Sequence, residues 1–175
     1  MKKYIKLAII TTVIFLVFGH FLCNYLYNSK YETYHSHVVY MNSLESLKNG
    51  TMQYEITYTR TLVKYEHLGD DISMDVTCNG KSIDNGLIIT PQCGETLDFF
   101  ATIKEMDSIP DVGSGSASLT LSTRYVQTKS RTVRIRVDES GHNRYKNAYA
   151  IFDVTFTVTP IIEDVEVGFW EVVLS

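Results

Sequence analysis

The sequence predicts a mainly β protein, an antiparallel β-sandwich of immunoglobulin-like or fibronectin-like type that follows an N-terminal transmembrane helix and a short helical stalk. Residues 7–27 contain no Asp, Glu, Lys or Arg, and from residue 52 onward apolar and polar residues alternate in short runs. About 20 apolar residues suffice to cross a bilayer as a helix. Short alternating runs separated by turn signals are typical of a sandwich of about seven or eight strands.

Length and composition suit one folded domain with an accessory segment. The chain has 175 residues, of which 45% are hydrophobic, and its formal net charge is −4. Its positive charge is concentrated in residues 124–146, which hold seven Lys or Arg against two acids. A nucleic-acid-binding protein has a dominant basic surface. We therefore expect no nucleic acid among the partners.

Residues 1–6 contain three lysines and are expected to form a cytoplasmic tail before the transmembrane anchor, residues 7–27. Because positive charge stays on the cytoplasmic side, the C-terminal part would lie outside the cytoplasm. Tyr25 and Tyr27 fall where an interfacial aromatic belt is expected. The protein is thus predicted to be a single-pass protein of the cell membrane, with the membrane itself as a partner.

Two other fates of this segment stay open. A cleaved signal peptide would release the remainder as a secreted protein, but such peptides have a shorter apolar core and a small-x-small cleavage site. The end of this run, residues 19–30, has no such site. A lipoprotein signal at Cys23 would need a small residue before the cysteine, where the chain has Leu22. An uncleaved anchor is therefore the preferred prediction.

Residues 28–50 are expected to form a helical stalk. Asn49 and Gly50 provide a helix stop at its end. Four apolar residues recur in it at every third position, close to helical spacing: Val38, Met41, Leu44 and Leu47.

Residues 51–175 are expected to form the extracytoplasmic β domain. The sole tryptophan, Trp170, falls in the last expected strand, so the tryptophan–cysteine pattern of true immunoglobulin domains is missing. The Gly-Ser-Gly-Ser stretch at 113–116 lacks the lysine and the helix of a phosphate-binding loop, and it predicts a flexible loop. Alternation predicts strands at residues 52–65, 71–78, 95–103, 116–126, 131–137, 151–159 and 165–174.

Two cysteines lie outside the anchor, Cys78 and Cys93. Cys78 follows the alternating residues of its strand onto the core face, whereas the direction of Cys93 in its loop cannot be predicted. In an oxidising compartment a disulfide between them would persist, and closing a loop of about 15 residues would contribute about 3 kcal/mol. We expect this disulfide, with two buried free thiols as the alternative.

The sequence contains no recognisable catalytic or cofactor motif, so we expect no cofactor, no metal and no enzymatic activity. His35 and His37 form an H-x-H pair, but on a helix they diverge by about 200° and cannot share a metal. His67, Asp70 and Asp71 gather at a turn, which explains the aspartates without a ligand. Carboxylates that meet only in the folded protein could still make it an exported hydrolase of cell wall or glycan.

The cluster of Lys and Arg in residues 124–146, called the basic block below, is the most informative polar feature. Arg134 and Arg136 share the wet face of one expected strand, and arginine suits two-point contacts with oxyanions. The alternative is a solvated sheet face whose arginines pair with acids on neighbouring strands, such as Asp153. The candidate residues for binding an anion or a protein partner are Arg124, Arg131, Arg134, Arg136, Arg144 and Lys146.

Together these features predict a membrane-anchored, non-catalytic β-sandwich on the extracytoplasmic side. It would bind a protein or an anionic surface polymer, or serve as an accessory subunit of an envelope complex. A pilin-like subunit shares the plan of an apolar helix before a β domain, but no Gly-Phe cleavage junction precedes the run and no glutamate lies near its start.

Overall fold

The computed structural model describes residues 2–66, 68, 71–106, 110–124, 126–139 and 148–175. These residues form two helices and eight strands. The chain divides into two compact units, one of Met1–Ser43 with Glu163–Ser175 and the other of Leu44–Ile162.

Helix α1 (Lys2–Lys48) is one continuous element, so the apolar run and the predicted stalk belong to the same helix. It ends in a Schellman motif. The backbone N–H of Gly50 donates to the carbonyl of Leu47 at 3.2 Å, and that of Thr51 donates to Ser46 at 2.9 Å. Gly50 has a φ of +67°, a left-handed conformation that glycine adopts without a Cβ penalty. The predicted helix stop at this glycine is confirmed.

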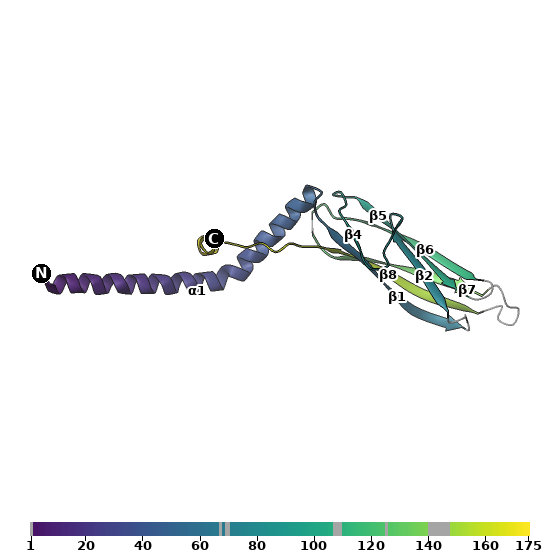
Figure 1. Ribbon diagram of the computed structural model, residues 1–175, viewed down its shortest axis with the longest axis horizontal. Coiled ribbons are helices and arrows are strands. Elements are labelled where there is room, and N and C mark those ends of the chain that lie inside the picture. Colours follow the sequence, from purple (N-terminus) through teal and green to yellow (C-terminus); the bar gives the residue numbers. More distant parts are fainter. Residues whose placement is uncertain (1, 67, 69–70, 107–109, 125, 140–147) are drawn as a thin grey trace. The chain divides into compact units, whose positions relative to one another are not determined.

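The eight strands form two antiparallel sheets of four strands each, packed as a β-sandwich (Figure 1). The first sheet has the order β4-β1-β8-β7 and the second the order β3-β2-β5-β6. The strands are β1 (Tyr54–Glu66), β2 (Ile72–Cys78), β3 (Lys81–Ser82), β4 (Leu87–Ile89), β5 (Thr96–Glu105), β6 (Asp111–Thr120), β7 (Lys129–Asp138) and β8 (Tyr149–Pro160).

The sandwich is confirmed, but the immunoglobulin-like topology is not. Strands β1 and β8 are neighbours in one sheet, with Tyr54 opposite Pro160. In an immunoglobulin constant domain the first and last strands belong to different sheets. The pairing also brings the chain's entry into the sandwich beside its exit, because the N–H of Ile161 donates to the carbonyl of Gln53 at 2.9 Å.

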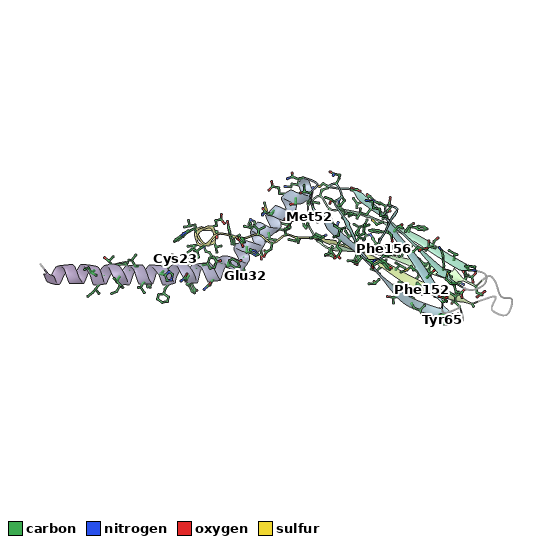
Figure 2. The ribbon with its side chains drawn as sticks, viewed as in Figure 1. Cys23, Glu32, Met52, Tyr65, Phe152 and Phe156 are labelled. Atoms are coloured by element: carbon green, nitrogen blue, oxygen red, sulfur yellow. The ribbon has the colours of Figure 1, made fainter. Side chains whose placement is uncertain are left out.

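The core lies between the two sheets and is built from alternate residues of the longer strands. Phe99 of β5 stacks on Phe156 of β8 across the sandwich, with ring centroids 4.7 Å apart. Met52, Phe152 and Phe156 are among its buried residues (Figure 2). Leu47, in the last turn of α1, is fully buried in the same cluster. Because burying such a side chain is worth about 1.5–3 kcal/mol, this leucine fixes the end of the helix to the sandwich.

Alternation does not predict β3 and β4, since runs of two and three residues are too short to show a period. A tight turn joins β2 and β3. Asn79 and Gly80 have φ values of +48° and +78°, as a two-residue type I′ hairpin requires.

The prediction of a flexible loop at residues 113–116 is wrong, because they form the middle of β6. A Cβ placed on Gly113 would lie 2.3 Å from the carbonyl oxygen of Arg136, and one on Gly115 would lie 2.4 Å from a methyl carbon of Val133. The glycines therefore allow β6 of one sheet to approach β7 of the other closely, a known use of glycine in strands.

The predicted C-terminal strand at residues 165–174 is also wrong. Residues 165–168 lie outside both sheets, and Phe169–Leu174 form the short helix α2. Val165, Val167 and Phe169 alternate with exposed residues as they would in a strand. This segment belongs to the same compact unit as α1, so its apolar side chains face a helix instead of a sheet.

Candidate functional site

The N-terminal part of α1 has an apolar surface that no other described part of the chain buries. None of the residues in its most apolar 18-residue window is buried, and the helix is long and apolar enough to cross a membrane. Phe15 is 72% exposed and Leu16 is 69% exposed. Exposed apolar surface of this extent marks a contact with lipid or with another protein. A long apolar N-terminal helix fits a membrane anchor or a signal sequence.

The C-terminal segment Glu163–Ser175 packs along α1 within the same unit (Figure 1). The ring of Phe169 stacks on that of Tyr27, with centroids 4.9 Å apart and an interplanar angle of 24°. Nearer the sandwich along the sequence, Nε2 of His35 lies 2.8 Å from a carboxylate oxygen of Asp164. Val172 of α2 is fully buried. The segment therefore contacts α1 through the polar contact of Asp164 with His35 and through aromatic and apolar packing.

A cavity of about 400 Å³ lies between α2 and α1. Its α1 side follows a helical stripe, because the residues recur at four-residue intervals. Among them, the amide of Asn24 lies 3.0 Å from a ring nitrogen of His20, so the two polar residues of the apolar run satisfy each other. The lining residues are Phe15, Leu16, Gly19, His20, Cys23, Asn24, Phe169 and Trp170.

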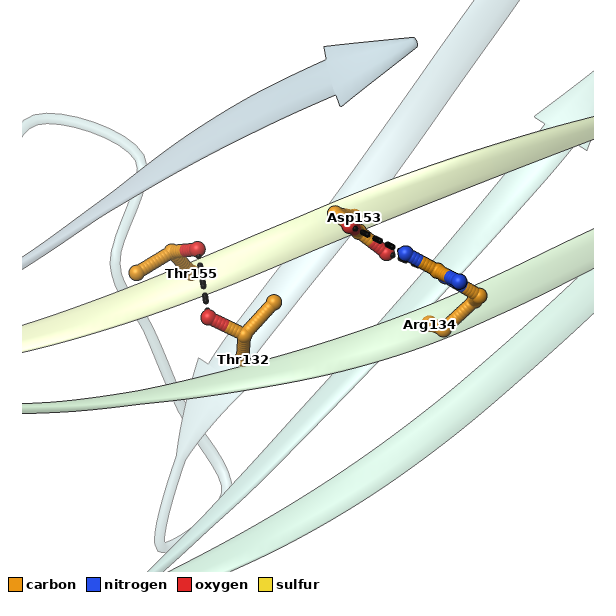
Figure 3. A network of polar contacts seen from close by, with 4 residues as sticks. All are labelled: Thr132, Arg134, Asp153 and Thr155. Atoms are coloured by element: carbon orange, nitrogen blue, oxygen red, sulfur yellow. Dashed lines mark hydrogen bonds and ion pairs between the residues drawn. The ribbon is translucent and has the colours of Figure 1, made fainter. Parts of the chain in front are cut away.

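The basic block is partly neutralised by acids. Arg134 makes a two-point ion pair with Asp153, at 2.8 Å from Nε and 2.9 Å from Nη2, between the neighbouring strands β7 and β8 (Figure 3). The hydrogen bond from Arg134 lowers the pKa of the Asp153 carboxyl. Next to this pair, the hydroxyls of Thr132 and Thr155 are hydrogen-bonded at 2.8 Å. The pairing with Asp153, which was the alternative to an anion site, is confirmed.

Arg136 has two partners. Its Nη2 lies 2.6 Å from a carboxylate oxygen of Asp138, and its guanidinium lies 3.9 Å from the ring centroid of Tyr149. Arg131 donates to the backbone oxygen of Ser130 at 3.2 Å. Among the described residues, neither Arg131 nor Arg124 forms an ion pair. The last two predicted members, Arg144 and Lys146, lie outside the described residues, as do His67 and Asp70. An anion-binding role for the block stays a prediction.

The predicted disulfide is not formed, because Cys78 and Cys93 are both free thiols. Cys78 is buried in the core at the end of β2, as predicted, whereas Cys93 is half-buried in the turn before β5. Burial, helped by Asp98 and Glu95, raises the pKa of the Cys78 thiol to about 11. Burial raises the pKa of Tyr54, and the neighbouring Cys93 adds to that rise. The two thiols thus lie in different surroundings. Cys78 lies in the core at the end of β2, a strand of the second sheet, whereas Cys93 lies beside Tyr54 of β1 in the first sheet.

A hollow of about 270 Å³ lies in the sandwich at the end of β2. It contains the acid Glu95, whose carboxylate accepts a hydrogen bond from the N–H of Gln92 at 2.8 Å. Neither a second carboxylate nor a histidine is among its described lining residues: Cys78, Asn79, Lys81, Ile88, Ile89, Thr90, Pro91 and Glu95. Within the described part of the chain no three potential metal ligands lie together.

The sequence analysis assigned no functional role to the C-terminal segment. Alternation placed both Phe169 and Trp170 in a strand. The segment does offer a sequence signal, because residues 147–175 contain five acids and no Lys or Arg next to a cluster of large apolar residues. His35 and His37 both lie on α1 and diverge, since His35 is half-buried under the C-terminal segment and His37 is exposed.

Comparisons with protein-family models, with curated proteins and with solved structures find no match for this chain.

Proposed function

We propose that this chain is a single-pass membrane protein that holds a non-catalytic β-sandwich on the extracytoplasmic side of a cell membrane. There the sandwich would bind a protein, or act as an accessory subunit of an envelope complex. The lysines at positions 2, 3 and 6 precede the apolar run, which favours a cytoplasmic N-terminus.

One observation supports an anchor over a cleaved signal. The C-terminal segment packs on α1, with Phe169 on Tyr27 and Trp170 at a cavity that Phe15 also lines. A signal peptide is removed from the mature protein. The packing of the C-terminal segment on this helix can exist in the mature protein only if the helix remains attached.

Vesicle flotation tests the anchor. We expect the full chain to float with lipid vesicles after a high-salt and carbonate wash, and a chain that lacks residues 1–29 to stay behind. The intact mass of the protein extracted from membranes should include the N-terminal residues. A full chain that stays dissolved, or a mature protein that starts after the apolar run, would contradict the proposal.

Protease accessibility tests the orientation. In right-side-out membrane vesicles from cells that express the full chain, an added protease should digest the β domain and leave an N-terminal fragment protected. Inside-out vesicles serve as the control and should give the opposite pattern. Protection of the β domain in the right-side-out vesicles would reverse the proposed topology.

The partner class is narrowed by the ion pairs. Because Arg134 and Arg136 are bound to Asp153 and Asp138, the block presents less free positive charge than the sequence suggests, and this favours a protein partner over an anionic polymer. Heparin retention checks the point. We expect wild type and the double variant Arg134→Ala/Arg136→Ala to elute together.

The matched control for that comparison is Arg60→Ala/Lys104→Ala, which also removes two positive charges, but from strands β1 and β5. A loss of retention that is confined to the first double variant would instead support an anionic surface polymer. An exported hydrolase stays the alternative prediction from the sequence. Two buried carboxylates, Glu105 of β5 and Asp111 of β6, lie opposite each other in register, but neither lines the hollow at the end of β2.

A further inference from the structure

Helix α2 presents an apolar face that no described part of the chain covers. Trp170 is 62% exposed and Leu174 is 81% exposed, and the two residues lie four positions apart, on one side of the helix. Val172 is fully buried. The helix therefore has one side packed in the protein and one bare side with a tryptophan and a leucine.

The polarity of the C-terminal segment changes in step with that of α1. Asp164 pairs with His35, which lies beyond the apolar run. Phe169 stacks on Tyr27, the last residue of that run. Trp170 then lies at a cavity lined by residues as deep in the run as Phe15. Acidic residues thus accompany the polar part of α1, and aromatic residues accompany its apolar part.

The distances along α1 place α2 at a defined depth. Tyr27 and His35 are eight residues apart, which is about 12 Å along a helix. The residues that line the cavity beside Trp170 run from Asn24 down to Phe15, about 5–18 Å below Tyr27 on the same scale. The shallower part of this range is the depth of about 5–10 Å at which interfacial helices lie at the headgroup and acyl boundary.

The polar groups of α2 fit such a position. The carboxylate of Glu171 accepts a hydrogen bond from the backbone N–H of Gly168 at 2.8 Å. It therefore satisfies a backbone donor at the start of its own helix. Tryptophan prefers the membrane interface because its ring is apolar and its N–H is polar. The cavity between the helices is mostly apolar and of a size that lipid chains can fill.

We propose that α2 is a second membrane-contacting element, which lies in the outer leaflet beside the α1 anchor and inserts Trp170 and Leu174 among the lipids. The occupant of the bare face is the bilayer, because Trp170 lines one cavity with Phe15 and Leu16, which are exposed on the proposed anchor. This inference rests on the proposed anchor. The chain would then enter and leave the sandwich through two segments that both contact the membrane.

The sole tryptophan of the chain makes the inference testable in the full-length protein. The protein is reconstituted in phosphatidylcholine–phosphatidylglycerol vesicles, and Trp170 fluorescence is recorded. We expect blue-shifted emission, strong quenching by lipids brominated near the headgroup end of their chains, and several-fold weaker quenching by aqueous iodide than in the denatured protein.

A reference variant separates this inference from the anchor itself. It combines Phe18→Trp with Trp170→Phe, so that its tryptophan reports on an exposed residue of α1 that does not line the cavity beside α2. Quenching of both tryptophans by brominated lipid supports the inference. If the reference is quenched by lipid while Trp170 is quenched by iodide, the anchor stands and the inference is overturned. If the reference is also quenched by iodide, the anchor fails, and the inference fails with it.

The remaining outcome of the quenching experiment is that protein, and not lipid, covers Trp170. If Trp170 is shielded from both quenchers, or becomes accessible to iodide when the protein is diluted into excess lipid, then protein covers the face and the inference is overturned. Leu174→Glu should raise iodide quenching of Trp170 several-fold, because a carboxylate opposes insertion. Ser175→Glu adds the same charge one residue later and should raise it less.

Discussion

At the scale of single residues, alternation predicted the direction of a side chain only within a strand. Cys78 points into the core as its strand predicted, and it is 1% exposed. Cys93 lies in a turn, where no period exists, and its neighbour proved to be Tyr54. The pairing of the two cysteines could not be predicted, because a disulfide depends on distance and on the direction of both Cβ vectors.

The buried thiol leads to a prediction about reactivity. At pH 8 the thiolate fraction of Cys78, with a pKa of about 11, should be about 100-fold smaller than that of a thiol with the ordinary value. We therefore expect a thiol reagent to label Cys93 before Cys78 in the native protein, and Cys78 only after unfolding. Mass spectrometry of the labelled peptides measures the order, and equal labelling of both native thiols would contradict it.

The same shift makes stability depend on pH. The pKa of Cys78 is raised from 9.0 to about 11, so between these values the unfolded chain loses this proton more readily than the folded chain. Its contribution is fully present below pH 9 and is lost as pH rises towards 11, by about 3 kcal/mol in total. The difference in unfolding free energy between wild type and Cys78→Ala should shrink over that range.

At the scale of elements, two predictions failed because the partner of a segment was unknown. Residues 113–116 have the composition of a loop, yet they form a strand because Gly113 and Gly115 let β7 come close. Residues 165–174 alternate like a strand, yet their apolar residues meet α1. Composition and period describe what a segment can bury, whereas the neighbour decides the conformation in which it does so.

The close approach at β6 can be tested by adding one methyl group. In Gly113→Ala the new carbon would lie 2.3 Å from a backbone oxygen of Arg136, so the strands must separate. We expect a loss of about 1–3 kcal/mol of unfolding free energy in urea titrations. Ser114→Ala, one residue along on the exposed face, should change it by no more than about 0.5 kcal/mol. Equal effects of the two substitutions would show that β7 does not constrain β6.

At the scale of the whole molecule, the described core belongs to one unit. Its members run from Leu47 to Val158, and all lie within Leu44–Ile162. The other unit, α1 with the C-terminal segment, has a mostly exposed apolar surface. The fold thus consists of a self-contained sandwich and a separate unit that depends on its surroundings for apolar contacts.

We therefore expect a fragment of residues 44–162 to fold alone in water. It should unfold cooperatively, at the same urea midpoint as the sandwich of the full chain in detergent. The matched variant Leu47→Ala in the fragment should lose about 2–5 kcal/mol, because it removes a fully buried leucine. A fragment that unfolds without cooperativity would show that the sandwich needs the other unit.

The sequence by itself determined the apolar helix, its end at Gly50 and most of the longer strands with their buried faces, because each depends on neighbours a few residues apart in the chain. It misplaced β6, which is Asp111–Thr120 and not residues 116–126. Only the tertiary structure decided the strand order, the free state of Cys78 and Cys93, the ion pair of Arg134 with Asp153 and the docking of the C-terminal segment on α1. These depend on contacts between residues far apart in sequence, and local periodicity contains no information about such distances.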